Sequence, residues 1–430
     1  MGVWSVKVLV VGGGGREHAL AWKLAQSPQV TKVFCMPGNG GTATLSKCLN
    51  MPMLPVDVEG ITRFALVQGV GLVVIGPETP LALGMADQMR AQGLRVLGPG
   101  QAGAQLEASK VWAKAFMQAE GIPTAPAQVF RELAPAQSYI EQQPLPVVVK
   151  VDGLAAGKGV TVAQTHAQAI QAVQAALTGQ FGQAGQQVLV ETFLTGEELS
   201  LLALTDGETL YPLLPAQDYK RLGAGDTGPN TGGMGACAPV PWVTEELLQR
   251  VEREIFAPLL AGLKRQGIDY RGVIYAGLMV TPQGDPLVVE FNCRFGDPET
   301  QVILPLLDSC LLELALACAE GRLGEVPPPV WRPGYAATVV MASGGYPGES
   351  VKGYPVRGLD LAEATGALVF HGATRRERNQ TFTDGGRVLN ITGYGATLDE
   401  ALEQSYLGVK QVSFTDCYYR EDIGWRLKNR

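Results

Sequence analysis

The first hundred residues alternate short apolar runs with helix-like segments, and this alternation restricts the fold more than any other feature of the chain. The apolar run VKVLVV at 6–11 precedes the amphipathic segment HALAWKLAQ, and the runs VTKVFCM and GLVVIG are spaced by similar segments. Apolar strands alternating with helices are typical of a parallel, doubly wound sheet with both faces covered. We therefore predict an N-terminal doubly wound α/β domain over residues 1–105.

Three of these predicted strands end in loops suited to a ligand. GGGGRE follows the first strand, PGNGG the second and GPE a later one. The carboxyl ends of parallel strands meet at one rim, where such sheets bind ligands. The candidate binding residues on this rim are Gly13, Gly14, Gly15, Arg16, Glu17, Asn39 and Glu78.

The GGGGRE loop begins like a dinucleotide-binding motif but departs from it. Glu17 stands at the third glycine position, and the next strand does not end in an acidic residue that could bind a ribose hydroxyl. An NAD site is therefore disfavoured. We favour an anion site formed by backbone N–H groups, the helix N-terminus and Arg16, and a tight turn without a ligand remains the alternative.

Lysines surround a second glycine-rich loop. Lys150 ends the apolar strand PVVV, Lys158 lies in GLAAGKGV between Gly157 and Gly159, and Lys110 lies on a preceding helix. The loop lacks the Walker spacing. A lysine at the end of a buried strand needs an anionic partner to keep its proton. A triphosphate site and ordinary surface charges remain equal alternatives at this point.

The segment VVEFNCRFGDPET carries the most specific chemistry. Strand alternation places Glu290 and Asn292 on one face, and their carboxylate and amide oxygens suit Mg²⁺. Arg294 shares that face and could neutralise a phosphoryl group or an acyl phosphate. A solvent-facing polar edge is the weaker alternative. The upstream glycine-rich segment GPNTGGMGA is equally consistent with close backbone approach to a ligand and with a mobile loop.

Composition excludes several other classes. With 430 residues, 46% apolar and 17% charged, we expect about three globular domains. The net charge of −7 and the lack of a basic block argue against nucleic-acid or membrane partners. Seven scattered cysteines and three histidines do not suggest a zinc or disulfide framework. The N-terminal apolar run is too short for a signal peptide, so we expect a cytoplasmic protein.

Taken together, these motifs resemble the glycinamide ribonucleotide synthetase (phosphoribosylamine–glycine ligase) family of ATP-grasp enzymes in purine biosynthesis. The matching stretches span nearly the whole chain in family order: GGGGREHAL, PGNGGTA, IGPETPL, LEASK, KVDGLAAGKGV, GEELS, DTGPNTGGMGA, YAGLM, EFNCRFGDPETQ, GGYPG, DGGRVL and DIGWR. The resemblance implies an ATP-grasp core of two subdomains at 106–330, with a mobile lid at about 125–192. It also implies a small α+β domain at 331–430, after the Pro-rich hinge.

The resemblance implies that ATP activates glycine as glycyl phosphate, which the amine of 5-phosphoribosylamine then attacks. Mg²⁺ or Mn²⁺ would be the cofactor, held by Glu290 and Asn292, and a monomer is expected. ATP would contact Lys110, Lys150, Gly157, Lys158, Gly159, Glu191, Thr192, Phe193, Leu194, Glu198 and Glu290. Arg294, Asp218 and Lys220 are the implied catalytic residues. The remaining implied substrate contacts are Asn230, Gly232, Gly233, Met234, Gly235, Asp297 and the N-terminal rim.

Two departures from the family pattern stand out. Thr192 occupies a position where members often carry a second acid, and VIYAGLMV lacks the metal-binding carboxylate found there in many ATP-grasp enzymes. Whether Asp218 supplies the missing ligand stays open. Two other classes of protein are disfavoured. The missing third glycine argues against a nicotinamide-dependent oxidoreductase, and the set Glu290, Asn292 and Arg294 argues against a non-catalytic ATP sensor.

Overall fold

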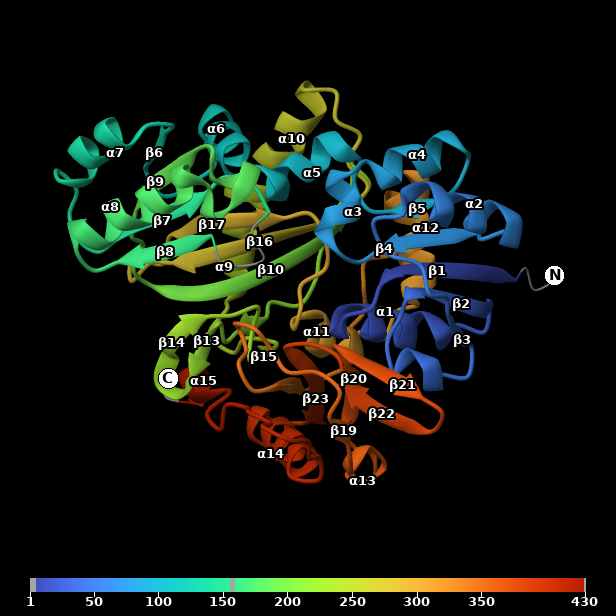
Figure 1. The fold of residues 1–430 in the computed structure, drawn as a ribbon. Helices are drawn as coiled ribbons and strands as arrows, with labels where there is room; N and C mark the ends of the chain where they lie inside the picture. The colour runs from blue at the N-terminus through green and yellow to red at the C-terminus, as the bar shows by residue number, and fades with distance from the viewer. Residues whose placement is uncertain (1–4, 155–158, 429–430) are drawn as a thin grey trace.

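The computed structural model describes residues 5–154 and 159–428, so the predicted site residues Gly157 and Lys158 lie outside the described part of the chain. The chain forms an N-terminal sheet domain, a middle region with two sheets, and a C-terminal sheet domain (Figure 1). This arrangement confirms the predicted multidomain α/β and α+β class.

The N-terminal sheet is parallel throughout, as predicted. Its order is β3-β2-β1-β4-β5, with β1 (Val6–Gly12), β2 (Val30–Pro37), β3 (Cys48–Asn50), β4 (Leu72–Ile75) and β5 (Val96–Leu97). Its helices are α1 (Gly15–Ala25), α2 (Val58–Gln68), α3 (Glu78–Ala82) and α4 (Met85–Ala91).

Alternate residues of β1 pack on opposite faces of this sheet. Leu9 belongs to one apolar cluster with Ile61 of α2, whereas Val10 belongs to another with Leu20 of α1. The second cluster also contains Leu312 from α12 (Leu311–Glu320), far along the chain. Apolar runs without polar alternation form these strands because both faces of the sheet are covered.

The middle region contains two antiparallel sheets. The first, the lid sheet, has the order β6-β9-β7-β8, with β6 (Ala127–Phe130), β7 (Val147–Val151), β8 (Val160–Ala163) and β9 (Val188–Thr192). Helices α7 (Leu133–Ile140) and α8 (His166–Ala175) pack on it and share a separate apolar cluster with it. The second, the base sheet, has the order β11-β10-β16-β17, with β10 (Glu197–Thr205), β11 (Leu210–Pro212), β16 (Gly272–Val280) and β17 (Pro286–Asn292).

Helices α5 (Gln101–Ala108), α6 (Lys110–Ala119), α9 (Glu245–Val251) and α10 (Ala257–Arg265) complete the middle region. The hydroxyl of Ser109 accepts a hydrogen bond from the Trp112 N–H and so caps α6 immediately before Lys110. β16 and β17 form a hairpin, since they pair antiparallel on either side of the turn PQGD at 282–285.

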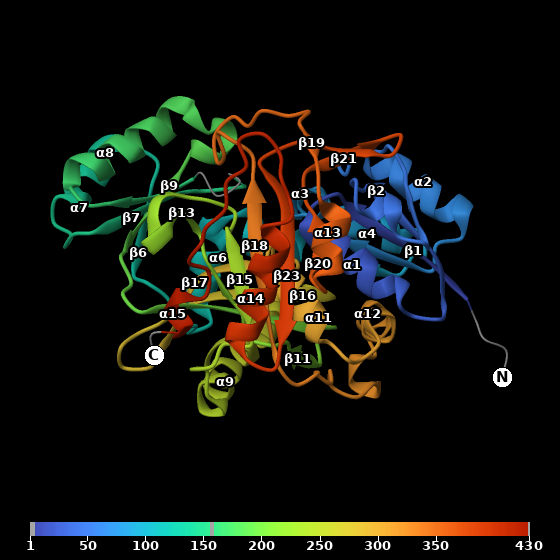
Figure 2. The ribbon, with the colours of Figure 1, turned by 90° about the horizontal axis from the view of Figure 1, so that it is seen from below.

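The C-terminal sheet has the order β12-β15-β18-β23-β20, and two of its strands come from the middle of the chain. The strands are β12 (Gln217–Asp218), β15 (Gly235–Ala238), β18 (Tyr335–Ala342), β20 (Leu368–His371) and β23 (Arg387–Gly395). Helix α14 (Leu398–Val409) packs on β18 and β23 (Figure 2). The domain also contains α13 (Leu359–Ala364), α15 (Trp425–Lys428), β19 (Pro355–Val356), β21 (Thr374–Glu377) and β22 (Gln380–Thr383).

Two further segments connect the sheets. The glycine-rich segment GPNTGGMGA begins within a short hairpin of β13 (Arg221–Gly223) and β14 (Thr227–Asn230), where Gly225 turns with φ 63° and Arg420 pairs with Asp226. The apolar stretch at 302–321 divides between α11 (Thr300–Leu306) and α12, with extended backbone at Leu307. No helix within the described residues is long and apolar enough to cross a membrane.

Candidate active site

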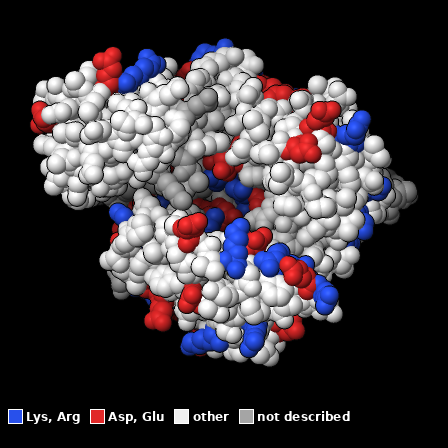
Figure 3. Space-filling view, in the orientation of Figure 1, with Lys and Arg blue, Asp and Glu red and all other residues white. Residues whose placement is uncertain are grey.

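A cavity of about 710 Å³ lies where the three regions meet, and charged side chains are visible in the central hollow (Figure 3). Many predicted site residues line it: Gly14, Arg16, Glu17, Glu78, Lys110, Lys150, Gly159, Glu191, Thr192, Phe193, Leu194, Glu198, Asp218, Lys220, Asn230, Gly232, Glu290, Asn292, Arg294 and Asp297. Gly13, Gly15, Asn39, Gly233, Met234 and Gly235 are outside this lining.

A buried carboxylate bridges two lysines on one wall. Glu191, the penultimate residue of β9, lies 2.7 Å from Lys150 Nζ on β7 and 3.1 Å from Lys114 Nζ on α6. Lys150 also donates to the Val289 carbonyl of β17 at 3.0 Å, and Lys110 donates to the Gly153 carbonyl at 3.0 Å. The wall is therefore cationic even with Glu191 ionised, as a polyphosphate requires.

Glu290 and Asn292 present the predicted pair of oxygen donors. Burial alone would raise the pKa of Glu290, but Lys220, Lys150, Lys110 and Arg294 outweigh burial and hold it below the ordinary value. Among the described residues, no lysine or arginine makes a direct ion pair with its carboxylate. An ionised carboxylate with free lone pairs, two residues from an amide oxygen, fits a Mg²⁺ ion that shares its ligands with phosphates.

Arg294 is held between carboxylates from two other elements. Its Nη2 lies 2.8 Å from Glu107 on α5 and donates to the Asn292 side chain at 3.1 Å. Its Nε lies 3.5 Å from Glu78 at the start of α3. Burial alone would raise the pKa of Glu78, yet Arg294 and Arg16 hold it below its usual value.

A second charged group surrounds β12. Lys220 lies 3.2 Å from Glu198 and 3.9 Å from Asp218. Burial, together with Glu299 and Glu198, raises the pKa of Asp218 to about 7 although Lys220 opposes the rise. The Tyr275 hydroxyl donates to Glu299 at 2.5 Å, so a buried polar network lies beneath Asp218. Asp218 is thus able to exchange a proton near neutral pH.

The glycine-rich loop after β1 is partly occupied by the protein's own carboxylates. The Gly14 N–H donates to Glu17 at 2.6 Å, and the Arg16 N–H donates to Asp297 at 3.3 Å. The Arg16 side chain pairs with Glu17 and donates to the Phe295 carbonyl. A phosphate in this loop would have to displace these contacts, whereas Glu17, Glu78 and Asp297 together suit hydroxyl or amine donors.

Asn39 joins loops rather than lining the cavity. Its Nδ2 donates to the carbonyls of Gly13, Gly14 and His371, at 3.0, 3.3 and 2.7 Å. It therefore connects the PGNGG loop, the first glycine loop and the C-terminal sheet. Gly15 is packed against both the C-terminal domain and α11, because a Cβ there would meet the side chains of Asn390 and Gln301.

The segment Asn230–Gly235 is tied to the C-terminal domain by Arg387. The Nη1 of Arg387 donates to the Gly232 carbonyl at 2.6 Å and to the Asp297 carbonyl at 2.8 Å. Gly233 adopts φ 113°, and Met234 is fully buried. This segment runs from the end of β14 to the start of β15, and its first residues, Asn230–Gly232, form a wall of the cavity.

Several charged or polar residues of the cavity are not among the predicted site residues, including Glu107, Lys114, Tyr275, Glu299, Tyr346 and Arg387. Each lies in or beside a quoted motif, since LEASK contains Glu107, FGDPET contains Glu299 and DGGRVL contains Arg387. Their position in or beside a motif was the sign in the sequence that they could belong to the site. Their partners are distant in sequence, so the pairing was not visible there.

Three family models match consecutive parts of the chain. They are described as phosphoribosylglycinamide synthetase N domain, ATP-grasp (A) domain and C domain, and they cover residues 6–107, 108–300 and 336–426. Relatives named phosphoribosylamine–glycine ligase include one from Nostoc sp., 61% identical over 99% of this chain and 100% of its own length. Another, from Escherichia coli strain K12, is 47% identical over 99% of each chain.

Solved structures agree with these matches. The crystal structure of phosphoribosylamine–glycine ligase from Thermotoga maritima superimposes with a TM-score of 0.84 at 34% identity, covering 97% of this chain and 100% of the other. Biotin carboxylase from Campylobacter jejuni gives a TM-score of 0.72 at 11% identity, covering 97% and 93%, which shows a shared fold. The ATP-grasp architecture predicted for the middle region is thereby confirmed.

Proposed function

We propose a reaction for this chain, which belongs to the phosphoribosylglycinamide synthetase family. The chain ligates glycine to 5-phosphoribosylamine with ATP, giving glycinamide ribonucleotide, ADP and phosphate. The observation that carries the proposal is the meeting of Lys150, Glu290 and Arg294 in one cavity with the carboxylate-rich N-terminal rim. We place this activity, a step of purine biosynthesis, in a cytoplasmic monomer.

The proposed reaction has two displacements. A carboxylate oxygen of glycine attacks the γ-phosphorus of ATP, and ADP leaves. The amine nitrogen of phosphoribosylamine then attacks the acyl carbon of glycyl phosphate, phosphate leaves, and the nitrogen loses a proton. No covalent bond to the protein is required, so positioning, charge and exclusion of water are the protein's contributions.

Each wall of the cavity has a part in this scheme. Lys110 and Lys150 hold the phosphates, and the adenine lies beside the strand link Glu191–Leu194. Glu290 and Asn292 would hold Mg²⁺ or Mn²⁺, which supplies charge neutralisation at the transferring phosphoryl group. Arg294 stabilises the acyl phosphate.

The acceptor substrate occupies the N-terminal rim in this proposal. Glu17, Glu78 and Asp297 are acceptors suited to ribose hydroxyls and to the amine. Asp218, with its pKa of about 7, is our candidate for the group that takes the proton from the amine nitrogen.

The decisive experiment measures ADP release with ATP, Mg²⁺, glycine and freshly made phosphoribosylamine. Release that requires all four supports the proposal. Absence of turnover, or equal turnover when alanine or formate replaces glycine, would contradict the specific assignment.

A Glu290→Ala variant tests the metal site in the same assay. We expect turnover to fall by at least about a hundredfold, the scale for removing a key electrostatic group. Unfolding temperature is the control for an intact fold. Retained metal-dependent turnover would remove Glu290 from the metal site.

A further inference from the structure

Glu107 connects the reacting end of β17 to the helix that precedes the phosphate-binding lysine. It lies on the last turn of α5, three residues before Lys110, and its side chain is only 9% exposed. Its Oε1 lies 2.8 Å from Arg294 Nη2. Its Oε2 accepts hydrogen bonds from the Cys293 N–H at 2.9 Å and from the Cys293 thiol at 3.3 Å. One carboxylate therefore fixes both a backbone position and the neighbouring guanidinium.

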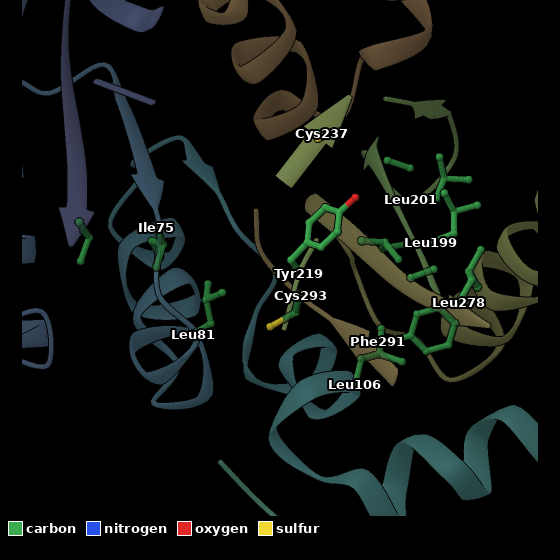
Figure 4. Packing of buried hydrophobic residues seen from close by; sticks show 14 of the residues in the cluster. Ile75, Leu81, Leu106, Leu199, Leu201, Tyr219, Cys237, Leu278, Phe291 and Cys293 are labelled. Carbon is green, nitrogen blue, oxygen red and sulfur yellow. The ribbon is translucent and has the colours of Figure 1, made fainter. Parts of the chain in front are cut away.

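The surrounding packing makes this contact rigid. Leu106, beside Glu107, belongs to the same apolar cluster as Phe291 and Cys293, and Figure 4 shows these side chains close together. Helix α5 packs on β17 in this region. A carboxylate on so constrained a backbone has little freedom to follow a moving partner, so it determines where the guanidinium lies.

Arg294 keeps N–H donors for a ligand, since its five N–H groups outnumber the partners that the described residues supply. Its Nη1 donates to the Phe295 carbonyl, and its Nη2 donates to Asn292 and pairs with Glu107. The buried Nε has no hydrogen-bond partner among the described residues, although Glu78 lies 3.5 Å away. A buried donor without a partner is costly, and a ligand oxygen in the cavity would satisfy it.

We propose that Glu107 is a positioning residue for the ligation, which fixes the guanidinium of Arg294 so that its Nε meets the oxygens of the reacting acyl phosphate. The inference rests on the proposed function, because that function assigns the acyl phosphate to Arg294. Glu107 acts through Arg294 and not on the substrate. Its removal therefore matters only while Arg294 is present.

A double-mutant cycle tests this dependence. Glu107→Gln keeps the size of the side chain but offers a single acceptor oxygen for Cys293 and Arg294 together. We expect kcat to fall between about tenfold and a hundredfold, the scale for a misplaced catalytic group. The KM for ATP should change less than about threefold, since Lys110 and Lys150 remain. In an Arg294→Ala background, Glu107→Gln should change kcat by less than about twofold.

Two further variants separate positioning from general loss of structure. Glu120→Gln removes another buried carboxylate that pairs with an arginine, Arg265, away from the cavity, and should leave kcat unchanged. Glu107→Asp keeps the charge and should retain more kcat than Glu107→Gln. If the glutamine variant does not fold, the aspartate variant takes its place in the cycle. Unfolding temperatures are measured for all variants.

The outcomes are distinct. An equal loss of kcat from Glu107→Gln in the wild-type and Arg294→Ala backgrounds overturns the positioning role and leaves the proposed function standing. So does full kcat in a folded Glu107→Gln variant. Absence of ligation by the unmodified protein removes the proposed function and this inference together.

Discussion

Individual charges in the cavity are balanced by partners shared among several residues. Glu191 contacts both Lys114 and Lys150, and Arg294 contacts Glu107 and Glu78. Removing one member of such a group leaves its neighbour paired differently rather than merely free. The effect of a substitution therefore depends on which charge remains.

Lys114 is expected to affect ATP affinity through its ion pair with Glu191, which also pairs with Lys150. In a Lys114→Met variant, Glu191 would neutralise Lys150 alone, so the wall would keep only the charge of Lys110. We expect the KM for ATP to rise about tenfold, the scale of a lost charge-assisted contact. Steady-state kinetics measure this, and Lys264→Met, which removes an exposed ion pair with Glu208, is the control. An unchanged KM in a folded Lys114→Met enzyme would contradict the prediction.

Asp218 is expected to set an acid limb in the pH profile. Its pKa of about 7 means that the carboxylate is increasingly protonated below neutral pH and can then no longer accept a proton. We expect kcat/KM for phosphoribosylamine to fall as the pH drops through about 7 in the wild type. Asp218→Asn should lower kcat/KM and remove this limb. Protonation of the substrate affects both proteins equally, so the difference between the two pH profiles reports on Asp218. Identical limbs in both would exclude Asp218 as the proton acceptor.

Sequence alternation on β17 predicted Glu290, Asn292 and Arg294 as one functional group, and the structure brings them to one cavity. It could not predict Glu107, because Cys293 and Glu107 are 186 residues apart and their contact depends on how α5 packs on β17. The glycine loop shows the same limit. Glu17 was noticed as a departure from a motif, but its hydrogen bond to the Gly14 N–H required the folded loop.

At the scale of elements, α1 and β20 join the N-terminal and C-terminal domains through two buried histidines. The His371 N–H donates to His18 Nδ1 at 2.8 Å, and His371 Nδ1 is 3.0 Å from the Thr374 hydroxyl. Burial, with a smaller effect from His371, holds the pKa of His18 well below its ordinary value. Burial, with a smaller effect from Arg376, lowers the pKa of His371 to about 4.

This contact predicts loss of stability in acid. The unfolded chain binds protons at these histidines below about pH 6.5, whereas the folded chain resists protonation until about pH 4 at His371. The contribution of the two histidines to the free energy of unfolding is therefore complete above about pH 6.5. It decreases as the pH falls toward 4, by about 1.4 kcal/mol per pH unit for each histidine.

Urea unfolding at pH 7 and pH 5.5 measures the effect. His18→Asn, which retains an acceptor for the His371 N–H, should show a smaller loss of unfolding free energy between the two pH values. His166→Asn removes a histidine outside this contact, on α8, and is the matched control. An equal pH dependence in the His18→Asn and wild-type proteins would refute the assignment.

Long apolar strands were predictable as elements, and β1, β2 and β4 lie where the apolar runs placed them. The short strands were not. β12 spans only Gln217–Asp218, and its pairing with β15 is imposed by the C-terminal sheet and not by local preference. Strand length and partner choice therefore separate the predictable elements from the others.

At the scale of the whole molecule, the lid sheet has its own apolar cluster, whereas the other regions share clusters with one another. The lid sheet contributes Lys150 and Glu191 to the cavity. A nucleotide bound there should therefore stabilise the lid sheet against unfolding together with the other regions. ATP with Mg²⁺ at about a hundred times its Kd should add about 2.7 kcal/mol to the free energy of unfolding.

Calorimetry with and without nucleotide measures this stabilisation as a rise in unfolding temperature. Lys150→Met should show a much smaller rise at the same ATP concentration. An equal rise in the two proteins would place the bound phosphates elsewhere. The domain limits 1–105, 106–330 and 331–430 remain predictions, and the two middle-region strands in the C-terminal sheet show how closely the second and third are joined.

The pairing of β15 with β18, and of β18 with β23, has a consequence for synthesis on the ribosome. The segment Asn230–Gly235 ends in β15, yet the strands that complete its sheet extend to Gly395. Domains generally fold in order as the chain emerges, but this segment must wait until most of the polypeptide has been translated. The five strands of the N-terminal sheet are therefore available for pairing early in elongation, whereas the catalytic pocket remains incomplete for much of it.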